Sequence, residues 1–380
     1  MPSDYTIACY YFPGYHPDPR NDARHGPGWT EWDLVRHARP RFEKHHQPLV
    51  PLWGYLDESD PAVMARKIDA AADHCIDTFI FDWYWYDGPF LADALDRGFL
   101  KAANNSRVQF ALMWANHDWL DIHPAKQNCP APLVFPSRVS PGVFDQITDH
   151  IISRYFSHPS YWKIDGRPYF SIYEMFKLVE SFGSLAATRD ALQRFRKKAQ
   201  AAGHPDLHLN GVIWGLRVPP DDPAAKTSGE VATFLGLDSV TSYVWVHYLT
   251  LESFPVTEYR QVLTKVLQKW RRFERDFPVP YWPNVTMGWD PSPRTVQSDR
   301  YMNTGYPYTP ILGGNTPVAF QEALLQVKTF LERRPPDQRI VTINAWNEWT
   351  EGSYLEPDTV HGMAYLAALR EAFYGEEKLA

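Results

Sequence analysis

Short runs of apolar, β-branched and aromatic residues recur along the chain, and each is followed by a loop and then by a segment with helical spacing. Eight such runs cover residues 5–12, 77–85, 108–116, 168–174, 207–215, 238–246, 281–289 and 339–346. Nearly continuous apolar strands are typical of a parallel sheet that is buried on both faces. Eight strands alternating with helices therefore predict an α/β fold, a single (β/α)8 TIM barrel that forms one domain over residues 1–380.

Helical spacing is clearest in six segments between or after these runs. They cover residues 61–75, 142–156, 188–202, 256–277, 316–334 and 362–375. An open doubly wound sheet is the alternative fold, but it requires a glycine-rich phosphate turn after the first strand, and "FPGYHPDP" is not one. The loops after the first and third strands, residues 13–61 and 117–141, are too long for simple connectors. In barrels such loops usually build the active-site face.

Composition and charge restrict the possible partners. The 380 residues carry a net charge of -7 with both signs interleaved, which argues against nucleic acid or a membrane surface. No apolar stretch approaches the length of a membrane-spanning helix. The start of the chain lacks the features of a signal peptide, and Cys9, Cys75 and Cys129 are too sparse for a disulfide framework. We expect a cytoplasmic protein, unless a leader was removed before cloning, and the sequence makes no prediction of oligomeric state.

Aromatic residues and carboxylates gather where the predicted strands end. Aromatic residues make up 15% of the chain, with 15 tryptophans, and the carboxyl ends of barrel strands share one face. Sugar rings stack on aromatic rings, and their hydroxyls bond to Asp, Asn and His. We therefore predict a carbohydrate site. The candidate substrate-binding residues are Tyr11, His16, Trp29, Glu31, Asp82, Trp83, Tyr84, Asn116, His117, Tyr173, Glu174, Trp214, Tyr243, Trp245, Trp289, Trp346, Asn347 and Trp349.

The segment "WNEWTEG" after the last strand contains the candidate catalytic residues, Glu348 and Glu351. Cleavage of a glycosidic bond requires one carboxylic acid to protonate the departing oxygen and one carboxylate to act as base or nucleophile. Neighbouring tryptophans would separate the two pKa values. An isolated glutamate more often caps a helix or pairs with arginine, but two of them at the top of a barrel favour catalysis. Glu356 is predicted to be structural.

The segment "NHDWLDIH" contains His117, Asp118, Asp121 and His123, which are all possible metal ligands. Their spacing matches no familiar metal motif. We therefore predict no metal site and no cofactor.

Several long motifs together resemble the WbsX-like proteins, often described as glycoside hydrolase family 99-like. They are "YYFPGYHPDPRND", "GWTEWDLVRHARPRFEKHHQPLVP", "WYWYDG", "HPSYWKIDGRPYFSIY" and "INAWNEWTEGSYLEPD". The match runs from the first strand to the last. The segment "NEWTEG" also resembles the corresponding part of family 99 endo-α-mannosidases and endomannanases, which are (β/α)8 barrels that act without metal.

The resemblance implies roles for both glutamates. Glu348 would deprotonate the substrate's own 2-hydroxyl, which attacks the anomeric carbon to give a 1,2-anhydro sugar. Glu351 would protonate the leaving group and then activate water, with net retention. This route needs a 2-hydroxyl trans to the leaving group, and on another sugar Glu348 would be an ordinary nucleophile. The family usually has "WANENWTRRWDG" at the third strand, whereas this chain has "WANHDWLDIHPAKQ", so the resemblance gives little guidance on the sugar.

Three functions fit these observations. The favoured one is a retaining glycoside hydrolase that acts on a microbial or plant polysaccharide. The second is a glycosyltransferase of surface polysaccharide synthesis, which should show a D-x-D motif, a glycine-rich turn or cations aimed at a diphosphate. "DESD", residues 57–60, instead reads as the start of a helix. The third is a binding barrel without activity, which would have no use for two catalytic carboxylates.

Overall fold

The computed structural model describes residues 4–220 and 222–374, and a parallel sheet lies at its centre. The order of the strands along the sheet is β12-β10-β9-β8-β4-β2-β1-β15-β13. Their bounds are β1 Thr6–Tyr11, β2 Thr78–Trp85, β4 Gln109–Trp114, β8 Arg167–Ile172, β9 His208–Val212, β10 Ser239–Thr241, β12 Tyr281–Trp282, β13 Asn284–Thr286 and β15 Ile340–Asn344. All eight predicted strands are confirmed, and the seventh is divided into β12 and β13.

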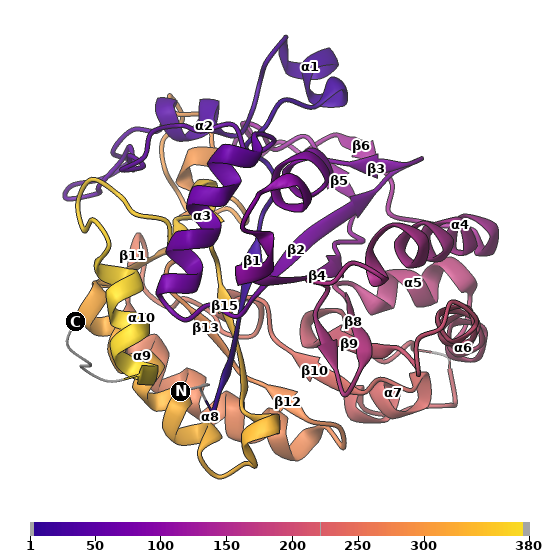
Figure 1. The fold of residues 1–380 in the computed structure, drawn as a ribbon. Helices are drawn as coiled ribbons and strands as arrows, with labels where there is room; N and C mark the ends of the chain where they lie inside the picture. The colour runs from indigo at the N-terminus through magenta and orange to yellow at the C-terminus, as the bar shows by residue number, and fades with distance from the viewer. Residues whose placement is uncertain (1–3, 221, 375–380) are drawn as a thin grey trace.

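The division of the seventh strand occurs at Pro283. Tyr281 pairs with Val240 of β10, whereas Asn284 pairs with Thr342 of β15. Proline has no N–H to donate to a ladder, so the strand changes partner at this residue. The two ends of the sheet path therefore meet within one short segment, and the sheet curls into a nearly closed α/β barrel (Figure 1). The predicted TIM-barrel fold is confirmed.

Helices surround the sheet (Figure 1). Their bounds are α3 Pro61–Asp73, α4 Pro141–Ile151, α5 Met175–Phe182, α6 Leu185–Ala201, α7 Ser228–Leu235, α8 Tyr259–Asp276, α9 Pro317–Leu331 and α10 Ala364–Tyr374. α3, α4 and α9 each begin with a proline. The residue before that proline caps the helix, because its side chain accepts a hydrogen bond from a backbone N–H; these capping residues are Asp60, Ser140 and Thr316. The predicted last helix begins two residues later than expected, and Gly375 lies outside the described residues.

The connection between β2 and β4 contains short turns where a regular barrel has a long helix. A π turn, Ala94–Gly98, is followed by two 3₁₀ turns, Phe99–Lys101 and Asn105–Arg107. A Cβ atom on Gly98 would lie 2.1 Å from the carbonyl oxygen of Glu58, so only glycine fits where this connection packs against the first long loop.

The two long loops lie together at the carboxyl ends of the strands, as predicted (Figure 1). The first contains helices α1 (Pro19–His25) and α2 (Trp32–His37), and the second contains the hairpin of β5 (Trp119–Leu120) and β6 (Leu133–Phe135). Arg20 of the first loop donates to the carbonyl oxygen of Tyr86, just after β2, at 2.6 Å, and its guanidinium lies 5.5 Å from the ring centre of Phe135 in the second loop. Among the described helices, none is long and apolar enough to cross a membrane.

Candidate active site

A tight hairpin after β15 carries both candidate catalytic glutamates. β16 (Asn347–Glu348) pairs antiparallel with β17 (Ser353–Tyr354), and the 3₁₀ turn Trp349–Glu351 joins them. Glu348 is 3% exposed and Glu351 is 8% exposed. The hairpin therefore holds two carboxyl groups in a nearly dry environment, where each responds strongly to neighbouring charge.

Arg294 is the cation that faces these carboxyl groups. Its guanidinium donates to Glu351 Oε1 at 2.5 Å and to Glu31 Oε2 at 3.2 Å, and it lies 3.8 Å from Glu348 Oε2. The side chain is buried and comes from the 3₁₀ turn Ser292–Arg294, after the seventh strand. One buried arginine thus lies within 4 Å of three carboxyl groups, which come from two separate loops.

Glu31 is a buried carboxylate that pairs with Arg294. Burial raises its pKa, but the charge of Arg294 and hydrogen bonds from His123 and Thr350 outweigh burial and lower the pKa to about 2. His123 Nε2 lies 3.2 Å from Glu31 Oε1, and Thr350 donates to Oε2 at 2.5 Å. Glu31 is therefore ionised at neutral pH.

Glu348 has the opposite environment. Burial raises its pKa well above the ordinary value, and the charges of Glu351 and Asp82 add to this effect, while Arg294 opposes it. Its Oε2 has no hydrogen-bond partner among the described residues. Glu348 therefore retains a proton well above the pH at which a free glutamate loses it.

Asp82 is a second carboxyl group whose surroundings favour its neutral form. It lies on β2 and accepts a hydrogen bond from the hydroxyl of Tyr243 at 2.8 Å. Burial raises its pKa well above the ordinary value despite this bond. Its Oδ1 has no partner within residues 4–220 and 222–374. Asp82 and Glu348 thus each have one carboxyl oxygen without a hydrogen-bond partner in the described part of the chain. Such oxygens are suited to bind the hydroxyl groups of a ligand.

One exposed aromatic residue, Tyr306, contacts this cluster. Tyr306 donates its hydroxyl to Glu351 Oε1 at 2.6 Å, although 46% of the residue is exposed. Its ring centre lies 6.0 Å from that of Trp289. The rim of the site therefore offers a flat apolar surface beside a carboxyl group.

A cavity of about 180 Å³ lies next to the cluster. Trp214, Arg217, Tyr243 and His247 are among its lining residues, and Tyr243 connects it to Asp82. The hydroxyl of Tyr173 lies 3.1 Å from His247 Nε2. Trp214 is 38% exposed and stacks on His247 at 4.7 Å between ring centres.

Two further predicted residues border the cluster. The pKa of Tyr84 is raised first by burial and then by the charges of Asp82 and Glu348, so its hydroxyl lies within the field of both. The ring of His117 lies 5.8 Å from that of Tyr84 and 5.9 Å from that of Tyr173.

Three predicted residues point away from the cluster, and these expectations were wrong. Tyr11 stacks on Phe81 outside the barrel, and Trp83 packs near His150 of α4. Trp245 is fully buried, and its ring lies 4.9 Å from that of Tyr259 in α8. Tyr11 and Trp83 lie on β1 and β2, where successive side chains point to opposite faces, so the neighbours of inward-facing residues point outward. Trp245 is not in a strand but begins the 3₁₀ turn Trp245–His247.

Four more predicted residues use their polar groups within the protein. The indole N–H groups of Trp346 and Trp349 donate to the two oxygens of Glu356, at 3.0 and 2.7 Å. Asn347 bonds to the backbone of Phe12. The amide of Asn116 exchanges two hydrogen bonds of 2.8 Å with the backbone of Glu174.

These contacts assign supporting roles to the four residues. Trp346, Asn347 and Trp349 hold the glutamate hairpin in place, and Asn116 holds the end of β8. The expectation that Glu356 is structural agrees with its contacts, which also include Lys67 Nζ at 2.5 Å. Glu174 supplies backbone groups and precedes α5.

Trp29 and His16 lie in the first long loop. The ring of Trp29 stacks on that of His25 at 4.2 Å. His16 is buried, with Nδ1 lying 2.9 Å from the carbonyl oxygen of Pro17, and its Nε2 has no partner in the described part of the chain. These contacts do not join either ring to the catalytic pair, so their substrate role stays a prediction. Arg294 and Tyr306, by contrast, are not predicted by the sequence, because neither follows a strand directly.

Fold and site together define an α/β barrel of the kind found among glycoside hydrolases. A family model described as Glycosyltransferase WbsX matches residues 7–369, and the chain belongs to this family. The expected family is thereby confirmed.

Relatives with known sequence are similar over the whole chain. An uncharacterized protein named WxcX from Xanthomonas campestris pv. campestris is 28% identical over 97% of the chain, in each of two strains. The chain spans about half the length of these curated relatives, 49% in both cases.

Solved structures share the fold. A protein titled "Glycoside hydrolase-like protein" superposes with a TM-score of 0.62 at 16% identity, covering 100% of this chain and 96% of the other. The GH99 endo-alpha-mannosidase from Bacteroides thetaiotaomicron has a TM-score of 0.53 at 13% identity, covering 98% and 97%. These likenesses support a WbsX/GH99-like domain at the level of the fold.

Proposed function

We propose that the protein is a retaining glycoside hydrolase whose catalytic residues are Glu348 and Glu351. The observation that carries this proposal is the different environment of the two buried carboxyl groups. Burial and nearby negative charge raise the pKa of Glu348, whereas Glu351 accepts hydrogen bonds from Arg294 and Tyr306. Glycosidases depend on two carboxyl groups in different protonation states.

In the first step, Glu348 takes the proton of the substrate's 2-hydroxyl while the 2-oxygen bonds to the anomeric carbon. The bond from that carbon to the leaving oxygen breaks, and Glu351 gives its proton to that oxygen. In the second step, Glu351 takes a proton from water, whose oxygen attacks the anomeric carbon. The 2-oxygen leaves that carbon and regains its proton from Glu348, so both residues return to their initial states.

The protonation of the pair must change when a sugar binds. Without substrate, Glu348 holds the proton, because burial raises its pKa. A sugar hydroxyl that donates to Glu348 stabilises its ionised form and lowers that pKa. Glu348 must therefore release its proton before the first step, in which it is the base and Glu351 is the acid.

The composition of the site supports a neutral sugar chain rather than a nucleotide sugar. A diphosphate requires cations that are available for bonding. Arg294, which faces the pair, is already engaged by Glu31 and Glu351. Arg217, which lines the neighbouring cavity, lies over the ring of Trp214 at 4.8 Å. The exposed faces of Trp214 and Tyr306 provide stacking surfaces for sugar rings.

The test is product release, followed by mass spectrometry, from polysaccharides that contain mannose, rhamnose, fucose, galactose or arabinose. Fragments released by the wild type without a nucleotide sugar are the expected result. Products that form only when a nucleotide sugar is supplied would replace this proposal with a transferase.

A further inference from the structure

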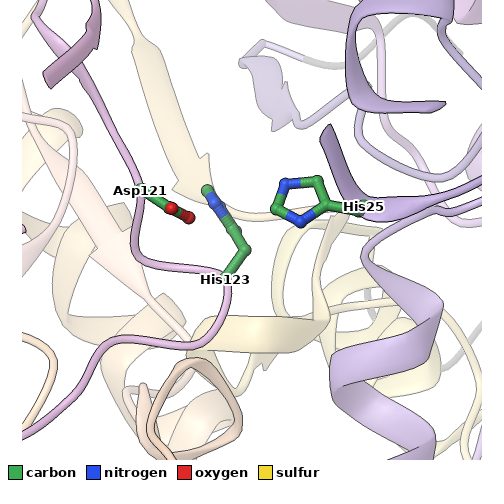
Figure 2. Close-up of side chains that lie close together, drawn as sticks. All are labelled: His25, Asp121 and His123. Atoms are coloured by element: carbon green, nitrogen blue, oxygen red, sulfur yellow. The ribbon is translucent and has the colours of Figure 1, made fainter. Parts of the chain in front are cut away.

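Three potential metal ligands meet between the two long loops. His25, Asp121 and His123 place one ligand atom each within 4.8 Å of one another. Figure 2 shows His25 approaching from one segment and Asp121 and His123 from another. His25 is the last residue of α1, whereas the other two follow β5. Imidazole and carboxylate are the ligands that zinc most often takes in proteins besides thiolate.

We propose that His25, Asp121 and His123 form a Zn²⁺ site that joins the first and third loops. Three protein ligands leave the fourth position of a tetrahedral ion open to water. The ligand atoms of such an ion lie about 3.4 Å apart, so from separations of at most 4.8 Å each side chain needs to move by no more than about 1 Å.

The surroundings of the three residues favour a fixed site over a mobile surface cluster. The ring of His25 stacks on Trp29 at 4.2 Å, and that of His123 stacks on Trp119 at 5.6 Å. His123 is buried, while His25 and Asp121 are half-buried. Both imidazoles thus have restricted orientations before any ion arrives, which reduces the entropy lost on binding.

A second carboxylate, that of Glu31, lies beside the ring of His123. Metal-binding histidines usually donate their other ring N–H to such a group. The Nε2 of His123 lies 3.2 Å from Glu31 Oε1, which leaves Nδ1 for the ion. A carboxylate that accepts from the far nitrogen fixes the tautomer and strengthens the ligand. Glu31 also bonds to Arg294, so the site is connected to the catalytic pair through two side chains.

Arg24 competes with a zinc ion for the carboxylate of Asp121. Its guanidinium lies 2.6 Å from Asp121 Oδ2, an ion pair in which both side chains are about one-third exposed. The carboxylate can keep this bond through one oxygen and bind zinc through the other, but the positive charge of Arg24 opposes the ion. Removal of Arg24 should therefore tighten zinc binding.

The sequence predicts no metal here because the three ligands do not form a local motif. Asp121 and His123 are close in sequence, but His25 comes from another loop, and only the fold brings it near. His117 and Asp118, which share the segment, lie elsewhere: Asp118 accepts from Ser137 and Lys177.

The test is calorimetric titration of the full chain with ZnCl₂ after treatment with EDTA. We expect one strong site in the wild type and a loss of affinity of at least tenfold in His25→Ala and His123→Ala. His46→Ala is the control, since His46 is exposed and outside the cluster, and it should bind like the wild type. Absence of a strong site in the wild type, or unchanged binding by His25→Ala, would overturn the proposal.

Arg24→Met provides a variant that does not remove a ligand. We expect it to bind zinc at least threefold more tightly than the wild type. Unchanged or weaker binding would show that Asp121 is not a ligand and would overturn the three-ligand site. The titration requires no substrate, so its outcome is independent of the proposed hydrolase activity.

Discussion

Arg294 determines the charge balance of the candidate active site. It is the cation shared by Glu31, Glu348 and Glu351, and it is 7% exposed. A buried carboxylate without a cation nearby is strongly unfavourable. Arg294 thus allows one part of the cluster to stay ionised while Glu348 remains protonated.

Replacement of Arg294 by methionine should destabilise the fold by about 3–5 kcal/mol, because the change leaves buried carboxylates unpaired. Arg260→Met is the matched control. Arg260 pairs with Glu322 at 2.6 Å on the surface, where water screens the pair, so its loss should change the free energy of unfolding far less than the loss of Arg294. Urea denaturation of both variants at neutral pH measures the difference. Equal losses would mean that Arg294 does not balance the buried carboxylates.

At the level of single residues, the sequence predicts the carboxylates better than it predicts their partners. Glu348 and Glu351 are evident from "WNEWTEG", and Asp82 from its place at the end of a strand. Arg294 is not evident, because its loop reaches the pair only through the closed barrel. Trp83 and Tyr11 lie at strand ends but outside the site, because position along a strand does not determine which face a side chain points to.

The hairpin of β16 and β17 is the element that positions the proposed catalytic residues, Glu348 and Glu351. Gly352 ends the 3₁₀ turn with φ at 63°, a conformation that favours glycine. A Cβ atom there would lie 2.7 Å from the Cβ of Asp290. Asp290 in turn accepts from His45 and Gln47, so it cannot move freely.

Gly352→Ala should therefore be more destabilising than the same change at another left-handed glycine. Gly183, which ends α5 with φ at 85°, serves as the control, because a Cβ atom there would have no neighbouring atom within 4 Å. We expect a loss of about 1 kcal/mol for Gly183→Ala from backbone strain and about 1–3 kcal/mol more for Gly352→Ala from the contact. Thermal unfolding measures both. Similar melting temperatures for the two variants would rule out a tight fit at Gly352.

At the level of elements, the periodicity of apolar residues predicts a strand or helix that is formed by one continuous segment of the sequence. The eight strands and the long helices follow from apolar runs and helical spacing. The change of partner at Pro283 depends on how the sheet closes, and the turns between β2 and β4 depend on contact with the loop around Glu58, so neither can be predicted from local pattern.

For the whole molecule, the buried carboxyl groups predict an unusual dependence of stability on pH. The folded pKa of Glu31, about 2, lies below its ordinary value of 4.5. Its contribution is therefore present above about pH 4.5 and is lost as the pH falls toward 2. Asp82 and Glu348 have raised pKa values, so their contribution is present at low pH and is lost as the pH rises through those values.

Glu31→Gln should remove the part of the acid-side loss that Glu31 contributes, about 3 kcal/mol for a shift from 4.5 to about 2. The variant should be less stable than the wild type at neutral pH, with a flatter profile between pH 4.5 and 2. Free energies of unfolding measured across this range test the prediction. Parallel profiles for the two proteins would contradict the pairing of Glu31 with Arg294.

The central claim is that Glu348 and Glu351 perform different steps of glycosidic cleavage. The most direct measurement compares Glu348→Gln and Glu351→Gln on two glycosides of the same sugar, one with a poor and one with an activated leaving group. In the first turnover, Glu351→Gln should release the poor leaving group about 10²-fold or more slowly than the wild type, but the activated group at a nearly normal rate, because an activated group needs no proton. Steady turnover of the activated substrate should still slow, because Glu351 no longer takes the proton from water. Glu348→Gln should lose both activities. Near-normal turnover of the poor substrate by either variant would contradict the account.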